Sequence, residues 1–282
     1  MRRADVVIKG KTALVTGAAG GIGLEFCKEL AKSGANLIML DISESRLASA
    51  KEEVEKFLAD SSNPQIKKAV SPQINLLSLD LTSEFIVESL EAYCAQNNLD
   101  PEILINNAGI FSFKPISDTD TKKIEAFVDI HVRAVTLLSQ WFVRKSKERS
   151  GGWLLNMSSM SCWMPMPGLA LYSSTKSYIR VFSRALHYEL KDYGVNVMVA
   201  CPGGIATDLF GLPKKWQKFA VAIGVLQTPR AFVAKAVKKM LKGKKQYING
   251  GLNRFSIFFV GILPTRVRMM VKHKLLDKGI TR

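Results

Sequence analysis

Cysteine and histidine are scarce in this sequence. Its 282 residues contain four scattered cysteines, with no CxxC pair: Cys27, Cys94, Cys162 and Cys201. Each lies in a stretch patterned as a helix or a strand, so we expect reduced, mostly buried thiols and no disulfide framework. The three histidines are His131, His187 and His273. They are too dispersed, and too far from carboxylates at ligand spacing, for a metal site, so we expect no metal.

Long hydrophobic runs are absent as well. The N-terminal segment MRRADVVIKGK has an apolar run of only three residues, which is too short for the hydrophobic segment of a signal peptide. The apolar run at 255–263 has nine residues, whereas a membrane-spanning helix needs about 20. These features predict a cytoplasmic protein. No internal repeat or low-complexity stretch occurs, and the length suits one large α/β domain.

Negative charge is under-represented. Lysine and arginine number 40 against 24 aspartates and glutamates, a formal net charge of +16. Such an excess favours an anionic partner, which could be a membrane surface, a nucleic acid or an acidic substrate. No aromatic RNA-binding signature accompanies the lysines, so we do not expect a nucleic-acid partner.

A glycine-rich turn joins the first expected strand, 11–16, to a helix with apolar positions at Ile22, Phe26 and Leu30. Glycines at such a turn let the backbone approach a pyrophosphate at the helix N-terminus, where free amides and the dipole favour negative charge. The strand before the turn and the amphipathic helix after it are the context that a dinucleotide-binding turn requires. The turn therefore predicts dinucleotide binding.

The second expected strand, 36–40, ends at Asp41. A carboxylate at this place accepts hydrogen bonds from the adenosine ribose and repels a 2′-phosphate. The glycine turn itself offers no basic residue. NAD is therefore favoured over NADP, although Arg46 leaves some room for the phosphorylated cofactor.

Strands and helices alternate along the rest of the chain. Further strands are expected at 74–79, 102–105, 152–158, 195–201 and 246–248, with helices at 44–59, 82–96, 121–147, 172–193 and 229–241. This alternation predicts a Rossmann-type, doubly wound α/β domain over residues 1–250, with a seven-stranded parallel sheet covered by helices on both faces.

Tyr172 and Lys176 lie four residues apart on one expected helix and therefore share a face. A free phenol has a pKa near about 10, and an adjacent ammonium favours the phenolate. We therefore expect a lowered pKa for Tyr172, which would make it a proton shuttle. The non-catalytic alternative for this spacing is a half-buried tyrosine beside a solvated lysine.

Four further motifs accompany this pair at characteristic distances. They are TGAAGGIG at 16–23, NNAG at 106–109, Ser159 thirteen residues before Tyr172, and PGGIAT at 202–207. In this order the chain resembles the short-chain dehydrogenase/reductase family over roughly residues 10–250.

The resemblance implies the roles of individual residues. Ser159 and Tyr172 would contact the substrate oxygen, whereas Lys176 would hold the tyrosine and the nicotinamide ribose, and Ser158 is disfavoured by the spacing. The implied cofactor-binding residues are Gly17, Ala19, Gly21, Ile22, Gly23, Asp41, Asp80, Leu81, Asn107, Ala108, Gly109, Tyr172, Lys176, Pro202, Ile205 and Thr207. Asp80 also suits a cap for the helix expected from residue 82, and Asn106 is expected to tie neighbouring strands together.

His131 departs from the pattern, because family members usually carry an asparagine there that helps to hold a water linked to the lysine. A histidine both donates and accepts hydrogen bonds, so it is a candidate member of a proton relay. The alternative is a hydrogen-bonded core histidine with no catalytic part.

Two apolar segments lie outside these motifs. Residues 208–228 interleave apolar side chains with lysines and are expected to form a lid over the substrate, or else a dimer contact. The tail, 251–282, sets apolar residues opposite basic ones. That pattern suits a helix lying on an anionic membrane, and suits equally a cover for the cleft or a subunit partner.

These features favour an NAD(H)-dependent oxidoreductase that interconverts a secondary alcohol and a ketone. The apolar lid and the loop at 162–167 favour a hydrophobic substrate, such as a long-chain acyl, steroid-like or lipid ketone, and we expect a homo-oligomer. The alternative is a catalytically impaired dinucleotide-binding scaffold or sensor at a membrane surface.

Overall fold

The computed structural model describes residues 8–60, 72–205, 215 and 226–276. Within these residues seven strands form one parallel sheet, as the sequence predicts, and their order is β3-β2-β1-β4-β5-β6-β7. The strands are β1 (Thr12–Thr16), β2 (Asn36–Asp41), β3 (Ile74–Ser78), β4 (Pro101–Asn106), β5 (Gly152–Met157), β6 (Val195–Ala200) and β7 (Gln246–Tyr247). The chain builds β1 to β3 outward on one side and β4 to β7 on the other, so the order reverses between β1 and β4.

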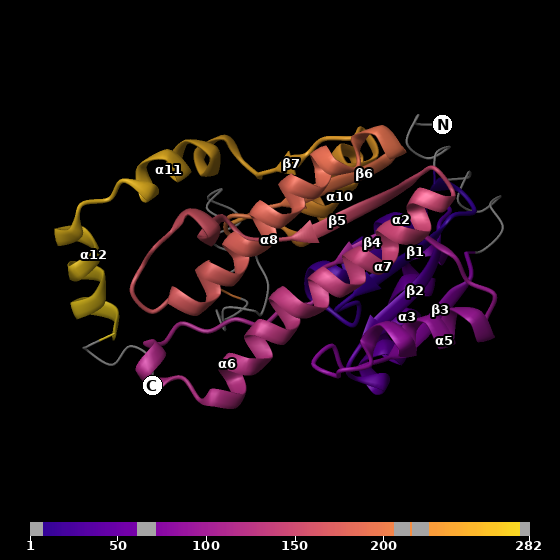
Figure 1. Cartoon of the computed structure of the whole chain (residues 1–282), viewed down its shortest axis with the longest axis horizontal. Coiled ribbons are helices and arrows are strands. Elements are labelled where there is room, and N and C mark those ends of the chain that lie inside the picture. The colour runs from indigo at the N-terminus through magenta and orange to yellow at the C-terminus, as the bar shows by residue number, and fades with distance from the viewer. Residues whose placement is uncertain (1–7, 61–71, 206–214, 216–225, 277–282) are drawn as a thin grey trace.

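Helices cover both faces of this sheet (Figure 1). One core lies between the sheet and α2 (Gly21–Lys32), α3 (Glu44–Ala59) and α10 (Pro229–Leu241). The other lies between the sheet and α5 (Ile86–Gln96), α7 (Val135–Glu148) and α8 (Ala170–Glu189). The Rossmann-type fold is thereby confirmed.

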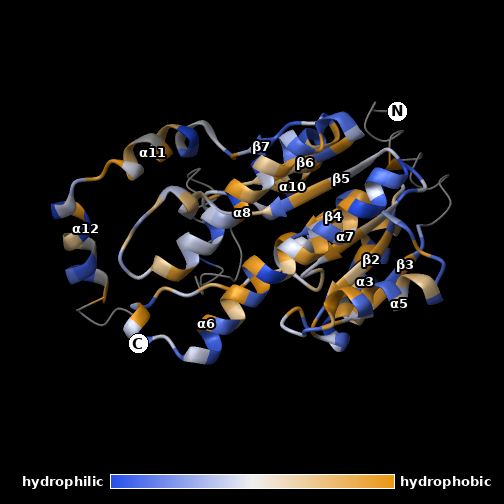
Figure 2. Cartoon of the chain, in the orientation of Figure 1, coloured by the Kyte–Doolittle hydropathy of each residue, from blue (hydrophilic) through white to orange (hydrophobic). Residues whose placement is uncertain are grey.

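Alternation of side chains along each strand explains the two cores. In β1, Ala13 and Val15 face the first core, and Leu14 faces the second. Successive side chains of a strand point to opposite faces, and a parallel sheet between two helical layers is buried on both. The central strands are therefore mostly apolar, as the orange length of β5 shows in Figure 2.

Two helix boundaries differ from the prediction, and one predicted helix contains a π-helical turn. The helix expected from residue 82 begins at Ile86. The Arg133 guanidinium donates to the carbonyl oxygens of Ser83 and Glu84 at 2.8 and 3.0 Å, and these hydrogen bonds hold the residues before the helix as a turn. The helix expected over 121–147 is confirmed as a continuous helical stretch, in which α6 (Thr121–Val128) and α7 are joined by a π-helical turn at Asp129–Ala134. That turn carries both His131 and Arg133.

Short helical turns follow two of these elements. A 3₁₀ turn, Met160–Trp163, follows β5, and another, Lys191–Tyr193, follows α8, so the helix expected to reach residue 193 ends at Glu189. All four cysteines are free, and three of them are buried, as the sequence predicts.

Beyond the sheet the tail forms α11 (Gly251–Gly261), α12 (Thr265–Val271) and a π-helical turn, Lys272–Leu276. No helix in the described ranges has both the length and the apolar character that crossing a bilayer requires. Most of the expected lid at 208–228 lies outside the described residues, as does Thr207.

Candidate active site

A cleft of about 530 Å³ opens at the carboxyl edge of the sheet, where the strand order reverses between β1 and β4. Ligands of open α/β sheets bind at such a switch point. The glycine turn forms one end of the cleft, and Ser159, Tyr172 and Lys176 line the other. One cleft therefore brings together the segments singled out in the sequence.

Most of the residues implied for cofactor binding line this cleft. They are Gly17, Gly21, Ile22, Asp41, Asp80, Leu81, Asn107, Ala108, Gly109, Tyr172, Lys176, Pro202 and Ile205. Ala19 and Gly23 support the turn from outside the lining: the Ala19 amide donates to Asp41 Oδ2 at 3.0 Å, and a side chain on Gly23 would collide with the carbonyl oxygen of Gly17.

The glycine turn is shaped to hold an anion against the N-terminus of α2. Gly17 and Gly21 have φ of +63° and +55°, a conformation that glycine adopts at little cost. A Cβ on Gly17 would lie 2.9 Å from the Ala108 Cα. The N-cap residue Gly20 has no capping side chain, and the first turn of α2 has no acidic residue. The amides there are free to bind phosphate oxygens, so the site fits a dinucleotide.

Asn107 fixes the turn from the neighbouring strand end. Its Nδ2 donates to the carbonyl oxygens of Thr16 and Gly17 at 3.0 and 3.2 Å, and the Thr16 hydroxyl accepts from its amide at 3.0 Å. Asn106 instead donates to Asn156 Oδ1 at 2.8 Å, which ties β4 to β5 as expected. Asn107 thus shapes the cofactor end of the cleft, and Asn106 belongs to the core.

Charges of both signs line the end of the cleft beside β2 and α3. Asp41 accepts from Ala19 and, at 3.4 Å, from the Ser43 amide, which orients its carboxylate at the end of β2. Arg46, in the first turn of α3, also lines the cleft, and its Nη2 lies 3.0 Å from where a Cβ on Gly20 would be. The helix therefore supplies the basic group that the turn itself lacks.

Asp80 lies on the loop after β3. Its Oδ1 accepts from the Thr82 amide at 2.8 Å, but α5 begins only at Ile86. The expectation that Asp80 caps this helix was therefore wrong, and Asp80 closes a short turn. Arg133 holds the same loop from the π-helical turn, so the loop is anchored where it lines the cleft.

Ser159 and Ser158 have different surroundings. Ser159 lines the cleft, and its hydroxyl accepts from the Ser161 amide at 3.1 Å. Ser158 is buried, and its hydroxyl donates to the Lys176 carbonyl oxygen at 2.7 Å. Ser159 is therefore the serine placed beside the Tyr172 phenol.

Tyr172 is enclosed by aromatic rings. The rings of Phe111, His131 and Phe127 have their centroids 5.0, 6.1 and 6.5 Å from that of Tyr172. Burial raises the pKa of Tyr172, while a hydrogen bond with Ser159 acts in the opposite direction. The lowered pKa expected from the sequence was wrong for this arrangement, because desolvation of the phenolate outweighs the other contributions.

Lys176 is fully enclosed on the same face of α8. Its Nζ lies 5.8 Å from the centre of the Tyr172 ring and donates to the Met157 carbonyl oxygen at 3.1 Å. Burial lowers the pKa of Lys176 to about 8, so at neutral pH most molecules still carry the ammonium. A cation therefore lies beside the phenol, held by the end of β5.

Both ring nitrogens of His131 are engaged. Nε2 accepts from the Ile110 amide at 3.1 Å, which leaves the proton on Nδ1, 3.0 Å from the Thr175 hydroxyl. That hydroxyl donates to the Tyr172 carbonyl oxygen at 3.1 Å. Burial, together with the charge of Lys176, holds the pKa of His131 well below its usual value. The imidazole is therefore neutral and links the end of β4 to the helix that carries Tyr172.

The sequence predicts no role for three residues of this region: Thr175, Ile110 and Arg133. Thr175 stands inside the Tyr172–Lys176 stretch, and its position three residues after the tyrosine is a signal that a polar partner faces the same side. Ile110 acts through its backbone amide, and Arg133 acts on backbone carbonyls. No motif in the sequence indicates the contacts of Ile110 or Arg133, because both involve backbone groups.

Comparisons with known proteins agree with this geometry. The family model described as short chain dehydrogenase matches residues 11–218. The very-long-chain 3-oxoacyl-CoA reductase of Bos taurus is 30% identical over 247 residues, which cover 86% of this chain and 71% of that protein. The cyclopentanol dehydrogenase of Comamonas sp. (strain NCIMB 9872) is 31% identical over 203 residues, covering 72% and 76% of the two chains.

A solved structure gives the same result at the level of the fold. A 7beta-hydroxysteroid dehydrogenase structure superposes with a TM-score of 0.75 at 26% identity, covering 89% of this chain and 91% of that one. The parallel sheet, the glycine turn and the extent of the family match together establish the relationship. The chain belongs to the short-chain dehydrogenase/reductase family and is an NAD(P)-dependent oxidoreductase acting on CH–OH groups.

Proposed function

We propose that the protein interconverts a hydrophobic ketone and its secondary alcohol with NAD(H). The observation that carries this proposal is that Ser159, Tyr172 and Lys176 line the same cleft as the glycine turn. A bound nicotinamide would supply or accept the hydride. The residues of this chain provide orientation and the proton.

In reduction, the substrate carbonyl oxygen accepts hydrogen bonds from the Ser159 and Tyr172 hydroxyls. Donors placed where negative charge develops stabilise the transition state. Because burial raises the pKa of Tyr172, the phenol is protonated at neutral pH and can donate its proton to this oxygen. The Lys176 ammonium then stabilises the phenolate that remains.

NADH is the proposed cofactor, because Asp41 presents its carboxylate at the adenosine end of the cleft. A carboxylate there favours ribose hydroxyls and repels a 2′-phosphate. Arg46 reaches the same end, which supports weaker use of NADPH. The balance between these two side chains would set the preference.

A hydrophobic substrate is supported by the surroundings of Tyr172. Phe111 packs edge-on against its ring, and a Cβ on Gly168 would lie 3.0 Å from the Phe113 ring. The relatives include enzymes named for a very-long-chain acyl-CoA and for cyclopentanol. These features support an apolar ketone such as a long-chain acyl, steroid-like or lipid ketone.

Assembly and location are further parts of the proposal. Val181 and Tyr188 are exposed on α8, which supports a homo-oligomer formed through this helix. Four free cysteines support a cytoplasmic location. The tail from Gly251 supports peripheral attachment to an anionic membrane.

The proposed reaction is tested by following NADH absorbance with a panel of apolar ketones. Wild type should consume NADH with at least one of them, whereas Tyr172→Phe should lose turnover and still bind NADH, as measured by nucleotide fluorescence. Retained turnover in Tyr172→Phe would contradict the assigned proton donor. NADH binding without turnover of any ketone by wild type would favour the scaffold alternative.

A further inference from the structure

The tail combines exposed apolar side chains with one sign of charge. Among the side chains of the tail that the structure describes, five large hydrophobic ones are exposed: Phe255, Phe259, Ile262, Met269 and Met270. Its basic residues are Arg254, Arg266, Arg268, Lys272 and Lys274, and residues 251–276 contain no aspartate or glutamate. An apolar surface of this kind on a water-soluble fold marks an interaction site, and its basic residues favour an anionic partner.

The apolar residues of α11 form one stripe. Phe255, Phe259 and Ile262 follow one another at spacings of four and three residues, so they share a face. Phe255 and Ile262 are 65% and 70% exposed, and the rings of Phe255 and Phe259 lie 4.8 Å apart. This stripe therefore points outward from the molecule.

Other residues of the tail contact the walls of the substrate end of the cleft. Ser256 lies 3.9 Å from the Met160 sulfur, in the turn that follows Ser159. A Cβ on Gly168 would lie 3.0 Å from Leu276, the last described residue of the tail. Two points of the described tail, Ser256 and Leu276, thus lie against the segment between Ser159 and Tyr172.

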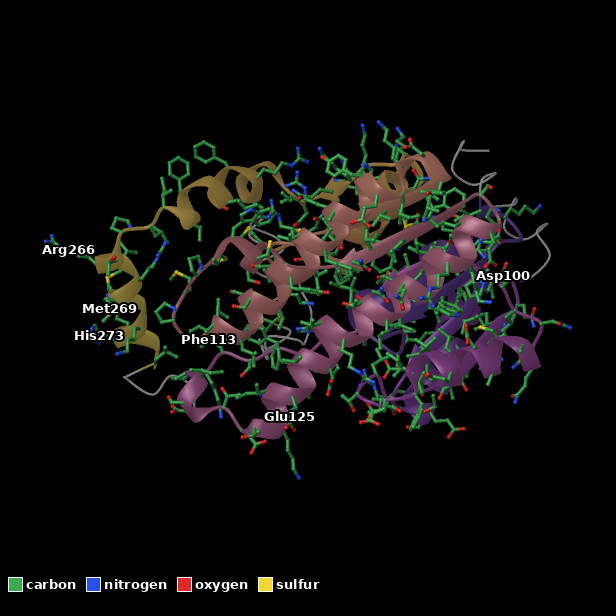
Figure 3. The ribbon with its side chains drawn as sticks, in the orientation of Figure 1. Asp100, Phe113, Glu125, Arg266, Met269 and His273 are labelled. Carbon is green, nitrogen blue, oxygen red and sulfur yellow. The ribbon has the colours of Figure 1, made fainter. Side chains whose placement is uncertain are left out.

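The tail also occupies one end of the molecule. In Figure 3, Arg266 and Met269 of α12 and His273 of the π-helical turn that follows lie at the end opposite Asp100, and Asp100 immediately precedes β4. Because parallel strands run from that edge toward the tail, α11 and α12 lie beyond the carboxyl edge, where the cleft opens (Figure 1).

We propose that the outer face of α11 and α12 binds an anionic lipid bilayer, with the mouth of the cleft directed toward it. Helices that set apolar residues against lysine and arginine bind at the interface of such bilayers, and each basic residue near the surface strengthens binding by about fivefold. The charge of the tail selects the bilayer over a second copy of this chain, because two identical basic surfaces repel one another.

This orientation extends the proposed function. Its consequence for substrate entry rests on the proposed reaction with an apolar ketone. A bilayer holds apolar ketones at high local concentration, and the cleft mouth beside the tail would receive them without passage through water. The ligand of the tail is the phospholipid surface itself. The substrate is a separate molecule dissolved in that surface.

Binding is tested by co-sedimentation of the full-length protein with phosphatidylcholine vesicles, with and without phosphatidylserine. Wild type should bind the phosphatidylserine vesicles, and added salt should weaken the binding. The apolar variant F255Q/F259Q/I262Q and the charge variant R266Q/K272Q/K274Q should each bind at least about tenfold more weakly. The matched control K122Q/K191Q/K244Q removes the same charge from exposed sites elsewhere and should change binding by less than about threefold.

Circular dichroism and NADH turnover with a water-soluble ketone should be the same in both tail variants as in wild type. Equal vesicle binding by wild type and both tail variants would overturn the proposal, as would equal losses in the tail charge variant and the control. A tail variant that changes sedimentation velocity in the absence of vesicles would instead identify a subunit interface and refute the bilayer as occupant. Vesicle binding is scored without catalysis, so it stands even if no ketone is turned over.

Discussion

The Nδ1 atom of His131 lies 3.0 Å from the Thr175 hydroxyl, which in turn donates to the Tyr172 carbonyl oxygen. On its other side the imidazole accepts from the Ile110 amide at 3.1 Å. A buried neutral ring therefore connects the carboxyl edge of the sheet with the helix that carries Tyr172. In this arrangement the ring holds two segments in place, and both nitrogens are engaged in doing so.

The first prediction concerns stability in acid. Burial lowers the pKa of His131, so below about pH 6.5 the unfolded chain takes up a proton that the folded chain does not. The folded protein should therefore lose up to about 1.4 kcal/mol of stability per pH unit in this range on account of His131. In His131→Gln this part of the slope should disappear, as measured by urea unfolding at pH 7 and pH 5.

His187→Gln provides the control for that experiment, because His187 is only partly buried and lies on α8 beside the Val197 carbonyl. It leaves the His131 ring in place, so the difference in slope between the two variants isolates the contribution of His131. An unchanged slope in His131→Gln would mean that the ring is charged in the folded protein, contrary to the structure.

A second prediction separates the two neighbouring serines. Ser159→Ala removes a hydroxyl from the cleft and should lower kcat by about 10²- to 10³-fold, the usual effect of losing a donor to developing negative charge. Ser158→Ala removes a buried hydrogen bond to the Lys176 carbonyl oxygen and should lower the free energy of unfolding by about 1 kcal/mol. Steady-state kinetics and thermal unfolding of both variants should show opposite patterns. A larger loss of kcat in Ser158→Ala would reverse the assignment.

The pH dependence of reduction provides a third prediction. Burial lowers the pKa of Lys176 to about 8, whereas burial raises the pKa of Tyr172. As the pH rises through about 8, the ammonium loses its proton while the phenol keeps its own. The value of kcat/KM for ketone reduction should therefore fall above pH 8, and the fall should be absent in Lys176→Arg, whose guanidinium stays charged. A profile that is flat to pH 10 in wild type would show that the ammonium is not required.

A fourth prediction concerns the cofactor. Asp41→Asn removes the carboxylate that faces the adenosine end and should raise kcat/KM with NADPH by about tenfold, equivalent to about 1.4 kcal/mol for a charge interaction near the surface. Arg46→Ala should lower kcat/KM with NADPH and leave NADH turnover nearly unchanged. Parallel assays with both cofactors test this. If Asp41→Asn leaves the ratio of the two unchanged, another residue sets the preference.

The sequence alone determined the alternation of strands and helices, the parallel sheet and the edge of the sheet at which the cleft opens. Apolar runs of five or six residues alternate with amphipathic helices, and parallel strands joined by right-handed crossovers have few topologies open to them. The glycine turn at 16–23 and the motif of Ser159, Tyr172 and Lys176 each occupy a short stretch of the chain. The strand, turn or helix that carries each motif could therefore be predicted from the sequence. Hydrogen bonds between residues that lie within one or two helical turns of each other in the sequence follow from such local patterns.

Only the tertiary structure decided the electrostatic state of the site. The pKa values of Tyr172 and Lys176 depend on burial, and this burial arises when α8 packs against the end of β5 and the rings of Phe111 and Phe127. The partners of His131, the anchoring of the Asp80 loop by Arg133 and the placement of Arg46 near the glycine turn all join segments that lie far apart in the sequence. Burial and long-range contacts arise when the helices pack on the sheet. The periodicity of apolar residues and the spacing of motifs in the sequence do not predict them.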